Sequence, residues 1–206
     1  MSGFWWLATT ASSEQEIKRS RFLCTLWPIN SLEQGQAIIQ QQKQQHSSAA
    51  HVCSAMLLAP GPSGQPAASS DDGEPSGTAG RPMLAVLQGS GLVGVCATVV
   101  RYYGGVLLGT GGLVRAYSDA VRQALLQAER RFQPELRWAK VTLSYPAYER
   151  MQRQWGKQWL IEWYEFQALV QLTLAIPKLQ QAEFEDDLMR YSDRQASLMW
   201  LQRQEP

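Results

Sequence analysis

Residues 101–112 read Arg-Tyr-Tyr-Gly-Gly-Val-Leu-Leu-Gly-Thr-Gly-Gly, with five glycines in twelve positions. The preceding residues 93–100 are almost all apolar and rich in β-branched side chains, which is typical of a central strand covered on both faces. Beyond the glycines, apolar residues recur at steps of three and four from Leu113 to Ala128, which predicts an amphipathic helix. The sequence therefore predicts a strand, a glycine-rich turn and a helix in direct succession.

The glycine-rich turn has two interpretations. In the first, the glycines let backbone amides approach a ligand, and the unpaired amides and dipole of the following helix attract an anion. Arg101 at the strand end and Arg115 in the first helical turn would add charge-assisted hydrogen bonds to a phosphate. In the second, glycine relieves backbone strain in a tight turn. The segment has no lysine and fits neither the Walker A nor the dinucleotide pattern, so both interpretations stay open. The glycines concerned are Gly104, Gly105, Gly109, Gly111 and Gly112.

A second candidate site lies in the Pro-, Gly- and Ser-rich segment 59–80, which is predicted to be a long loop. Such a loop is rare in a compact domain unless it is functional or disordered. It carries three carboxylates within four residues, Asp71, Asp72 and Glu74. They would suit a hard cation or a basic group of a partner, whereas aspartates that bond nearby amides in a turn are common chemistry. No further ligand at fixed spacing supports a metal, and we predict neither a metal nor a cofactor.

His51 and Cys53 lie two residues apart on a predicted strand, 51–59. Together with His46 their spacing matches no zinc pattern. Side chains two apart on a strand are also not held within the hydrogen-bond distance that a Cys–His nucleophile needs. We therefore expect Cys53 to be a buried, unreactive side chain, and we predict no catalytic residue.

Hydrophobic patterns place further elements on both sides of these motifs. In the N-terminal half they predict a strand over 21–29, a helix capped by Asn30 or Ser31, and a helix that starts at Pro82. A linker at 131–137 then separates two domains, 1–134 and 137–206. The second domain has the βαββαβ order of ferredoxin-like folds. Its predicted elements are a strand at 138–145, a helix at 146–157, strands at 159–166 and 168–176, a helix at 177–191 and a strand at 194–201.

The composition limits the class of partner. The 19 Lys and Arg against 18 Asp and Glu leave a formal net charge of +1, which excludes an indiscriminate nucleic-acid clamp but allows a small basic patch. No apolar run has the roughly 20 residues of a membrane span, and neither a signal peptide nor a disulfide framework is evident. We therefore expect a soluble, cytoplasmic protein without a membrane partner. The aromatic side chains at the C-terminal end would form a core, a protein interface or a base-stacking surface. They are Trp155, Trp159, Trp163 and Tyr164.

With these motifs in place, the sequence resembles the IMPACT/YigZ family of translation-associated proteins. The similarity is carried by residues 16–22, 46–53, 70–80 and 101–117, of which the last two segments are long and specific. The resemblance implies an α+β chain with an N-terminal ribosomal-protein-S5-domain-2-like domain. It also implies a C-terminal ferredoxin-like domain similar to the fifth domain of a translocating elongation factor. Eleven positions match the family motifs and are transferred as a binding surface for a ligand or RNA: His51, Asp71, Asp72, Glu74, Arg101, Gly104, Gly105, Gly109, Gly111, Gly112 and Arg115.

These observations lead to three functional hypotheses. The first is a non-catalytic protein that binds RNA, the ribosome or a translation-regulatory protein and takes part in the regulation of translation. The second is an enzyme or binding protein for a phosphorylated small molecule or nucleotide at the glycine-rich turn. The third is a protein-interaction module that uses the aromatic C-terminal domain. A single site requires that the loop at 71–74 and the turn at 109–112 lie together in the fold.

Overall fold

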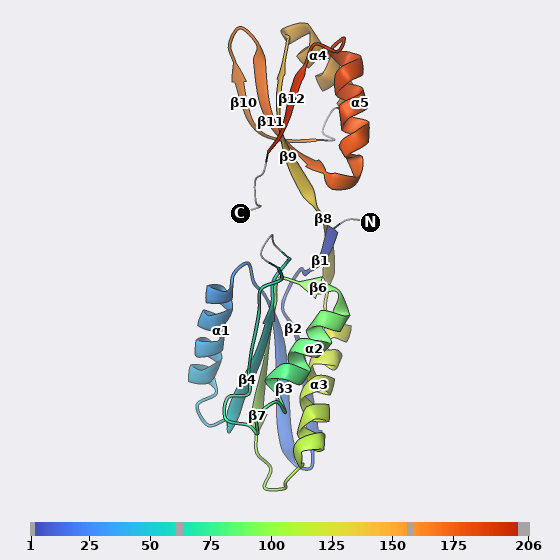
Figure 1. Cartoon of the computed structure of the whole chain (residues 1–206). Helices are drawn as coiled ribbons and strands as arrows, with labels where there is room; N and C mark the ends of the chain where they lie inside the picture. The colour runs from blue at the N-terminus through green and yellow to red at the C-terminus, as the bar shows by residue number, and fades with distance from the viewer. Residues whose placement is uncertain (1–2, 61–63, 156–158, 202–206) are drawn as a thin grey trace. The chain divides into compact units, whose positions relative to one another are not determined.

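The computed structural model describes residues 3–60, 64–155 and 159–201 (Figure 1). The chain divides into two compact units, one formed by residues 4–133 and the other mainly by residues 134–206. Each unit packs helices on an antiparallel β-sheet, which confirms the predicted α+β class. In the described part of the chain, no helix is both long and apolar enough to cross a membrane.

The N-terminal unit is built on a five-stranded antiparallel sheet with the order β2-β3-β7-β4-β5. The strand predicted at 21–29 is confirmed as β3, in which Phe22, Cys24 and Leu26 are fully buried. They alternate with more exposed neighbours because successive side chains of a strand point to opposite faces. The strands are β2 (Ala11–Ile17), β3 (Ser20–Pro28), β4 (His51–Leu57), β5 (Ala67–Ser70) and β7 (Val95–Tyr102).

Helices cover both faces of this sheet (Figure 1). Leu113 and Tyr117 belong to the main core, which lies under α2 and α3, whereas Ile29, Met56 and Cys96 form a smaller cluster under α1. The central strand β7 is therefore buried along almost its whole length, as its uninterrupted apolar sequence predicts. The helices are α1 (Leu32–Gln45), α2 (Gly80–Ser90) and α3 (Thr110–Leu126).

Three boundaries test the sequence patterns. Ser31 caps α1 as expected, and its side chain accepts a hydrogen bond from the amide of Gln34 at 3.2 Å. The segment 59–80 is not a continuous loop, because β5 within it pairs with β4. The helix predicted from Pro82 begins at Gly80. The amide of Gly80 donates to the side chain of Asp71, so this carboxylate and not the proline marks the start of the helix.

The predicted linker at 131–137 contains the boundary between the two units, at residues 133 and 134, but most of it forms strands rather than a loop. Its first residues form β8 (Arg130–Pro134), the edge of a three-stranded sheet with the order β6-β1-β8, and β9 begins at Leu136. Pro134 suits an edge strand because its missing amide leaves no partner unpaired. The rings of Phe132 and Trp5 pack together with their centroids 5.3 Å apart. The two residues are far apart in the sequence, so local composition does not indicate this contact. The other two strands are β1 (Gly3–Leu7) and β6 (Leu92–Val93).

The C-terminal unit has the predicted element order. Its antiparallel sheet has the order β10-β11-β9-β12, which is consistent with a ferredoxin-like arrangement. Val141, Leu172 and Leu174 of the sheet share a core with Met151 and Phe184 of the helices. The likenesses of the two units to a ribosomal protein and to an elongation-factor domain stay predictions. The elements are β9 (Leu136–Leu143), α4 (Tyr145–Trp155), β10 (Leu160–Phe166), β11 (Val170–Pro177), a 3₁₀ turn (Lys178–Gln180), α5 (Gln181–Tyr191) and β12 (Ser197–Leu201).

Candidate functional site

The two motifs singled out in the sequence meet in the N-terminal unit, where β7 ends and the glycine-rich turn leads into α3. A cavity of about 430 Å³ opens there. Four of the predicted site residues line it: His51, Glu74, Arg101 and Gly109. The carboxylate loop and the glycine-rich turn therefore contribute to one cavity, as the single-site hypothesis requires.

A buried ion pair forms part of the cavity wall. Oε1 of Glu74 accepts hydrogen bonds from Nη1 of Arg101 and from the hydroxyl of Tyr117, each at 2.7 Å. The side chains of Arg101 and Glu74 are only 7% and 2% exposed. The guanidinium also lies over the rings of Phe22 and Tyr103, 5.5 and 5.4 Å from their centroids. Burial raises the pKa of the Tyr117 phenol, which keeps it a hydrogen-bond donor to the carboxylate.

Asp71 is not part of the cavity lining, because its carboxylate closes the N-terminus of α2. Oδ1 accepts from the amides of Ala79 and Gly80 at 2.9 and 2.8 Å, and Oδ2 accepts from the amide of Gly77 at 2.7 Å. Partial burial alone would raise the pKa of Asp71. The three hydrogen bonds and the charge of Arg81 outweigh this effect and lower the pKa. For Asp71 the turn interpretation, in which aspartates bond nearby amides, is therefore confirmed.

Asp72 joins three segments of the unit at a backbone φ of +45°. Its carboxylate accepts from the amide of Val52 at 2.7 Å and forms an ion pair with Lys43 of α1. Its carbonyl oxygen is 2.7 Å from Nδ1 of His51. The two aspartates thus hold the loop in place. Among the described residues, no cluster of three or more His, Cys, Asp or Glu side chains could hold a metal ion.

His51 is held in one orientation beside the cavity. Because a carbonyl oxygen only accepts, Nδ1 of the ring donates the hydrogen bond to Asp72. Nε2 lies 4.0 Å from Oε1 of Glu74, too far for a hydrogen bond, and His51 lines the cavity. Cys53 on the same strand is fully buried, and burial raises the pKa of its thiol to about 12, as expected for an unreactive cysteine.

Gly104 has a packing role. A Cβ atom added there would lie 2.1 Å from the backbone carbon of Arg19, so only glycine fits. Its amide donates to Oγ of Ser20 at 3.1 Å, which ties the glycine-rich turn to the turn between β2 and β3. At this position glycine is required for the close packing of two backbone segments, not for relief of strain or for access to a ligand.

The start of α3 is different, because its first amides have no side-chain cap. Gly109 precedes the helix at a φ of +73°, and Gly111 and Gly112 lie in the first turn, where no acidic residue stands. In the described residues no side chain accepts a hydrogen bond from these amides. Arg115 lies in the second turn, since the helix begins at Thr110, and its Nε donates to the carbonyl of Gly111 at 3.3 Å. The amides that the anion interpretation needs are thus present, whereas Gly111, Gly112 and Arg115 are outside the cavity lining.

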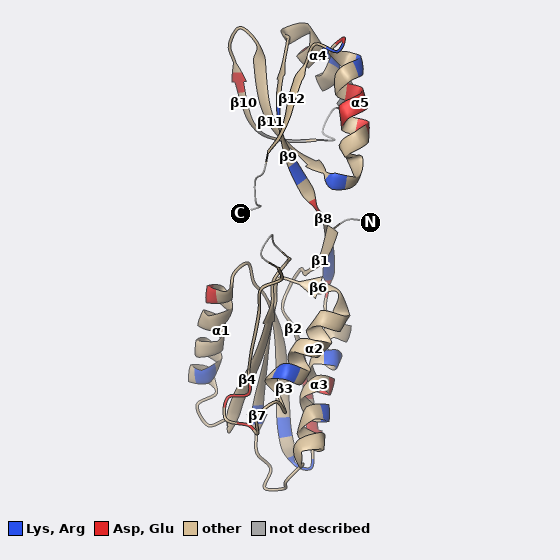
Figure 2. Cartoon of the chain, in the orientation of Figure 1, with Lys and Arg blue, Asp and Glu red and all other residues tan. Residues whose placement is uncertain are grey.

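A basic turn lies beside this site, within the segment 16–22 that carries part of the family resemblance, but sequence reasoning did not select it as a site. Lys18 and Arg19 form the two-residue turn between β2 and β3, with φ values of +48° and +66°. Both are exposed, and neither forms an ion pair or side-chain hydrogen bond within the described part of the chain. Figure 2 shows the Lys and Arg residues that gather where this hairpin ends near the start of α3. Residues 11–17 are mostly polar, so the sequence pattern does not predict β2. Without β2, the hairpin that it forms with β3 is not predicted either.

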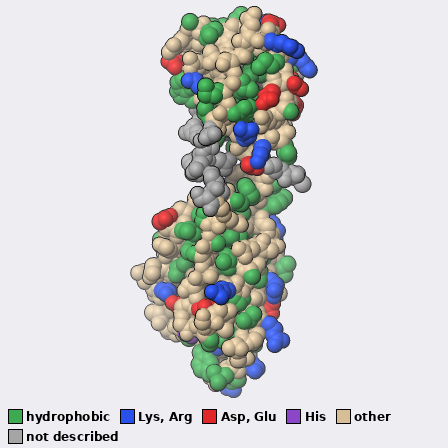
Figure 3. Space-filling model, viewed as in Figure 1, with side chains coloured by type: hydrophobic (Ala, Val, Ile, Leu, Met, Phe, Trp, Pro, Cys, Tyr) green, Lys and Arg blue, Asp and Glu red, His purple; other side chains and the backbone are tan. Residues whose placement is uncertain are grey.

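Two exposed apolar side chains stand on the cavity rim, and no sequence pattern selects them. Tyr103 is 51% exposed and Leu107 81% exposed, although both line the cavity. The lower end of the N-terminal unit in Figure 3 accordingly shows hydrophobic side chains next to Lys and Arg. The exposed ring of Tyr103 therefore stands on the rim, one residue from the contact of Gly104 with the basic turn.

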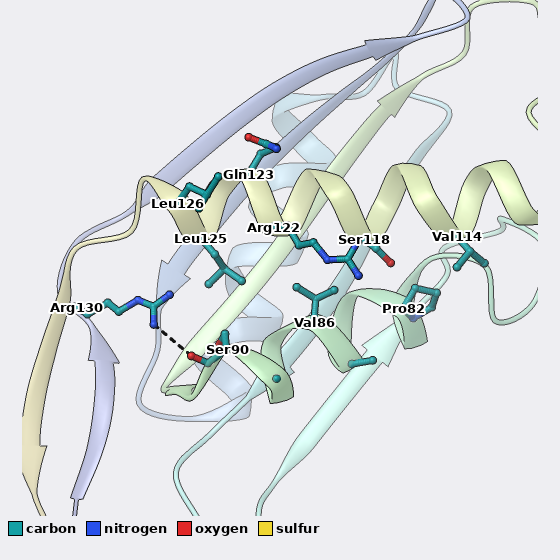
Figure 4. A pocket seen from close by; sticks show the side chains of 12 residues that line it. Pro82, Val86, Ser90, Val114, Ser118, Arg122, Gln123, Leu125, Leu126 and Arg130 are labelled. Carbon is teal, nitrogen blue, oxygen red and sulfur yellow. Dashed lines mark hydrogen bonds between the residues drawn. The ribbon is translucent and has the colours of Figure 1, made fainter. Parts of the chain in front are cut away.

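A more open groove of about 830 Å³ lies between α2 and α3 (Figure 4). Pro82 and Val86 of α2 face Val114 and Leu125 of α3 across it. None of the predicted site residues lines this groove, and nothing in the structure indicates its occupant. We therefore place the candidate site in the smaller cavity.

The C-terminal aromatic residues divide into core and surface. Trp159 is buried and packs against Phe184 with ring centroids 5.6 Å apart. Trp163 and Tyr164 are 44% and 60% exposed on β10. The side chain of Trp155 lies outside the described residues. A core role is therefore confirmed for Trp159 alone.

Comparison with known proteins identifies the family. Residues 18–125 match the model of the Impact N-terminal domain. The chain is 39% identical over 190 residues to "IMPACT family member YigZ" of Escherichia coli (strain K12), over 91% of this chain and 93% of that protein. It is 41% identical over 181 residues to an IMPACT family member of Haemophilus influenzae, over 87% of each chain. The crystal structure of a hypothetical protein, 36% identical, superposes with a TM-score of 0.71 over 99% of this chain and 100% of that one. The chain therefore belongs to the IMPACT family.

Proposed function

We propose that this protein binds RNA, free or in the ribosome, without catalysing a reaction, and that it thereby takes part in the regulation of translation. The observation that carries the proposal is the basic turn of Lys18 and Arg19. A left-handed conformation costs an ordinary residue about 1–2 kcal/mol, and two-residue hairpin turns favour Asn-Gly for this reason. Strained backbone is concentrated at functional sites. Two exposed cations at such positions support a binding role.

The surroundings of this turn match the chemistry of RNA. Lys and Arg side chains neutralise phosphates, and exposed aromatic rings stack on unpaired bases. Gly104 packs directly on the backbone of Arg19, so the exposed ring of Tyr103 stands one residue from this contact. The patch is small, which agrees with a net charge of only +1.

The same geometry favours binding over catalysis. The carboxylates of Asp71 and Asp72 are engaged in hydrogen bonds that hold the loop, and Glu74 is paired with Arg101. None of these three is therefore placed as a free general base. A role in translation is supported by membership of the IMPACT family.

An RNA-binding assay with two double variants tests this proposal. Lys18→Asn with Arg19→Gly removes both cations and supplies residues that prefer the turn, so the folded state should gain stability while RNA affinity falls. The control, Arg131→Gln with Lys140→Gln, removes two exposed cations from β8 and β9 and should leave affinity unchanged. Affinity is measured by fluorescence anisotropy at several salt concentrations, and ribosome association by co-sedimentation.

The salt dependence gives the second readout. For single-stranded RNA, the slope of log K against log salt should become shallower by about 0.7 for each phosphate that the variant no longer neutralises. The proposal fails if the wild-type chain binds no RNA at low salt. It also fails if the Lys18→Asn, Arg19→Gly variant binds RNA as tightly as the wild type.

A further inference from the structure

The start of α3 forms one side of the cavity, where Gly109 and Thr110 belong to the lining. The amides of Thr110, Gly111 and Gly112 belong to the first helical turn, and such amides have no partner within the helix. The helix dipole adds a partial positive charge at the same place. Three neighbouring amides suit an anion with several oxygens, of which phosphate is the common biological example.

Arg101 provides an independent indication of a ligand on the same cavity. The residue is 6% exposed, and its Nη1 is paired with Glu74, but its buried Nε has no hydrogen-bond partner in the described structure. Buried polar atoms normally have partners, so an orphan donor in a cavity wall calls for an acceptor. Arg101 and Gly109 line the same cavity.

The rest of the cavity is apolar and suits a flat body attached to the anion. Tyr103, Leu107 and Leu108 form this part of the lining. The volume of about 430 Å³ falls within the roughly 300–1,000 Å³ of small-molecule sites. Inorganic phosphate alone would leave this surface unfilled. His51 also lines the cavity, and its Nε2 can form a hydrogen bond with a hydroxyl such as that of ribose.

We infer that this cavity binds a nucleoside monophosphate, with the phosphate at the start of α3 and the base against Tyr103. The nucleotide is either free or the phosphorylated end of an RNA chain. In its RNA form the inference rests on the proposed function, and it deepens that function: the basic turn holds the RNA backbone, and the cavity selects a terminal phosphate.

Binding assays with matched RNAs separate the two sources of the nucleotide. Three oligonucleotides of one sequence carry a 5′-phosphate, a 3′-phosphate or hydroxyls at both ends, and AMP, adenosine and inorganic phosphate serve as competitors for the full chain. We expect one terminal phosphate to raise affinity about tenfold at constant salt, and AMP to abolish this gain where adenosine does not.

Each outcome decides between the two proposals. Equal binding of the three RNAs without competition by AMP would overturn the inference and leave the proposed function standing. AMP binding without any RNA binding would overturn the proposed function and keep the cavity as a site for the free nucleotide. Binding of neither would overturn both.

Two pairs of variants locate the ligand within the cavity. Gly111→Asp brings a carboxylate to the start of α3 and should reduce AMP affinity at least tenfold, whereas Gly111→Ala should not. Tyr103→Ala should weaken AMP without changing inorganic phosphate, whereas Tyr103→Phe keeps the ring and the affinity. Circular dichroism establishes that each variant is folded. Unchanged AMP affinity in Gly111→Asp or in Tyr103→Ala would contradict the inferred pose.

Discussion

Two helices of the N-terminal unit, α2 and α3, begin at or next to a glycine, but in the described part of the chain only the first amides of α2 donate to a side chain of the protein. At α2, Asp71 reaches in from the preceding loop and accepts from the amides of Ala79 and Gly80. At α3, Gly109 offers no side chain, and no cap from the described residues replaces it. Both helix ends favour an anion for the same physical reason. The end of α2 is filled by the chain's own carboxylate, and the end of α3 is left open to an outside one.

This difference separates structural from functional roles within one set of motifs. Sequence reasoning grouped Asp71 with Glu74 as a ligand site. In the structure Asp71 acts as an internal anion for α2, and Glu74 balances Arg101 beneath the open end of α3. The candidate site is therefore at the start of α3, where the backbone amides have no side-chain hydrogen-bond acceptor from the described residues.

The largest effect is expected from the ion pair at the open end. Glu74→Gln removes the charge that balances buried Arg101 and should reduce the free energy of unfolding by about 3–5 kcal/mol, because an uncompensated charge stays in the interior. Urea denaturation measures this loss. The double variant Glu74→Gln, Arg101→Met removes both charges and should recover most of it. A loss below about 1 kcal/mol in the single variant would show that the pair is not buried as described.

A smaller loss is expected at the closed end. Asp71→Ala deprives three amides of their acceptor and should cost about 1–3 kcal/mol, as the removal of a helix cap and of charge-assisted hydrogen bonds does. The matched change at the open end, Thr110→Ala, removes no cap and should stay within about 0.5 kcal/mol of the wild type. Thermal or urea unfolding measures both, and equal losses would erase the contrast between the helices.

The pH dependence of the same position gives a second measurement. The pKa of Asp71 is lower in the folded chain than its unfolded value of about 3.9. Its stabilising contribution is therefore complete above about pH 4 and is lost as the pH falls through the lowered folded pKa. The stability difference between the wild type and Asp71→Asn should shrink on acidification below pH 4. A difference that stays constant from pH 7 to the acid transition would mean that the Asp71 carboxylate does not cap α2.

The sequence predicted elements whose signals are local. β7, the glycine-rich turn and α3 follow from an apolar run, five glycines and a helical period, and the C-terminal order follows from alternating patterns of the same kind. β1, β2, β5 and β8 are not predicted. The residues of β2, β5 and β8 are polar or follow turn composition, β1 has only five residues, and the pairing of all four depends on strands elsewhere in the sequence. Phe132 and Trp5, which are in contact in the fold, show how far apart such partners lie in the sequence.

The candidate site was predictable in its parts but not in its roles. The meeting of His51, Glu74, Arg101 and Gly109 agrees with the motifs, since each stands in or beside an unusual local sequence. Tyr117 has an ordinary position in the apolar stripe of α3, so its hydrogen bond to Glu74, 43 residues away, has no local signal. Which carboxylates are satisfied internally depends on such long-range contacts.

The smallest effect comes from converting the open helix end into a closed one. Gly111→Asp and Gly111→Ala should both stabilise the chain by relieving a helical glycine, because a Cβ there meets no atom closer than 3.9 Å. The aspartate should add a further increment of about 0.3–1 kcal/mol, the worth of a negative charge in a first turn, and salt should weaken that increment. Unfolding of both variants in low and high salt measures it. An increment that survives high salt, or that is absent at low salt, would mean that the start of α3 does not attract an anion as the start of α2 does. Because the atom nearest to that Cβ is Nη2 of Arg115, only a salt-sensitive gain that persists in an Arg115→Gln background would show that α3 lacks the charge that Asp71 supplies to α2.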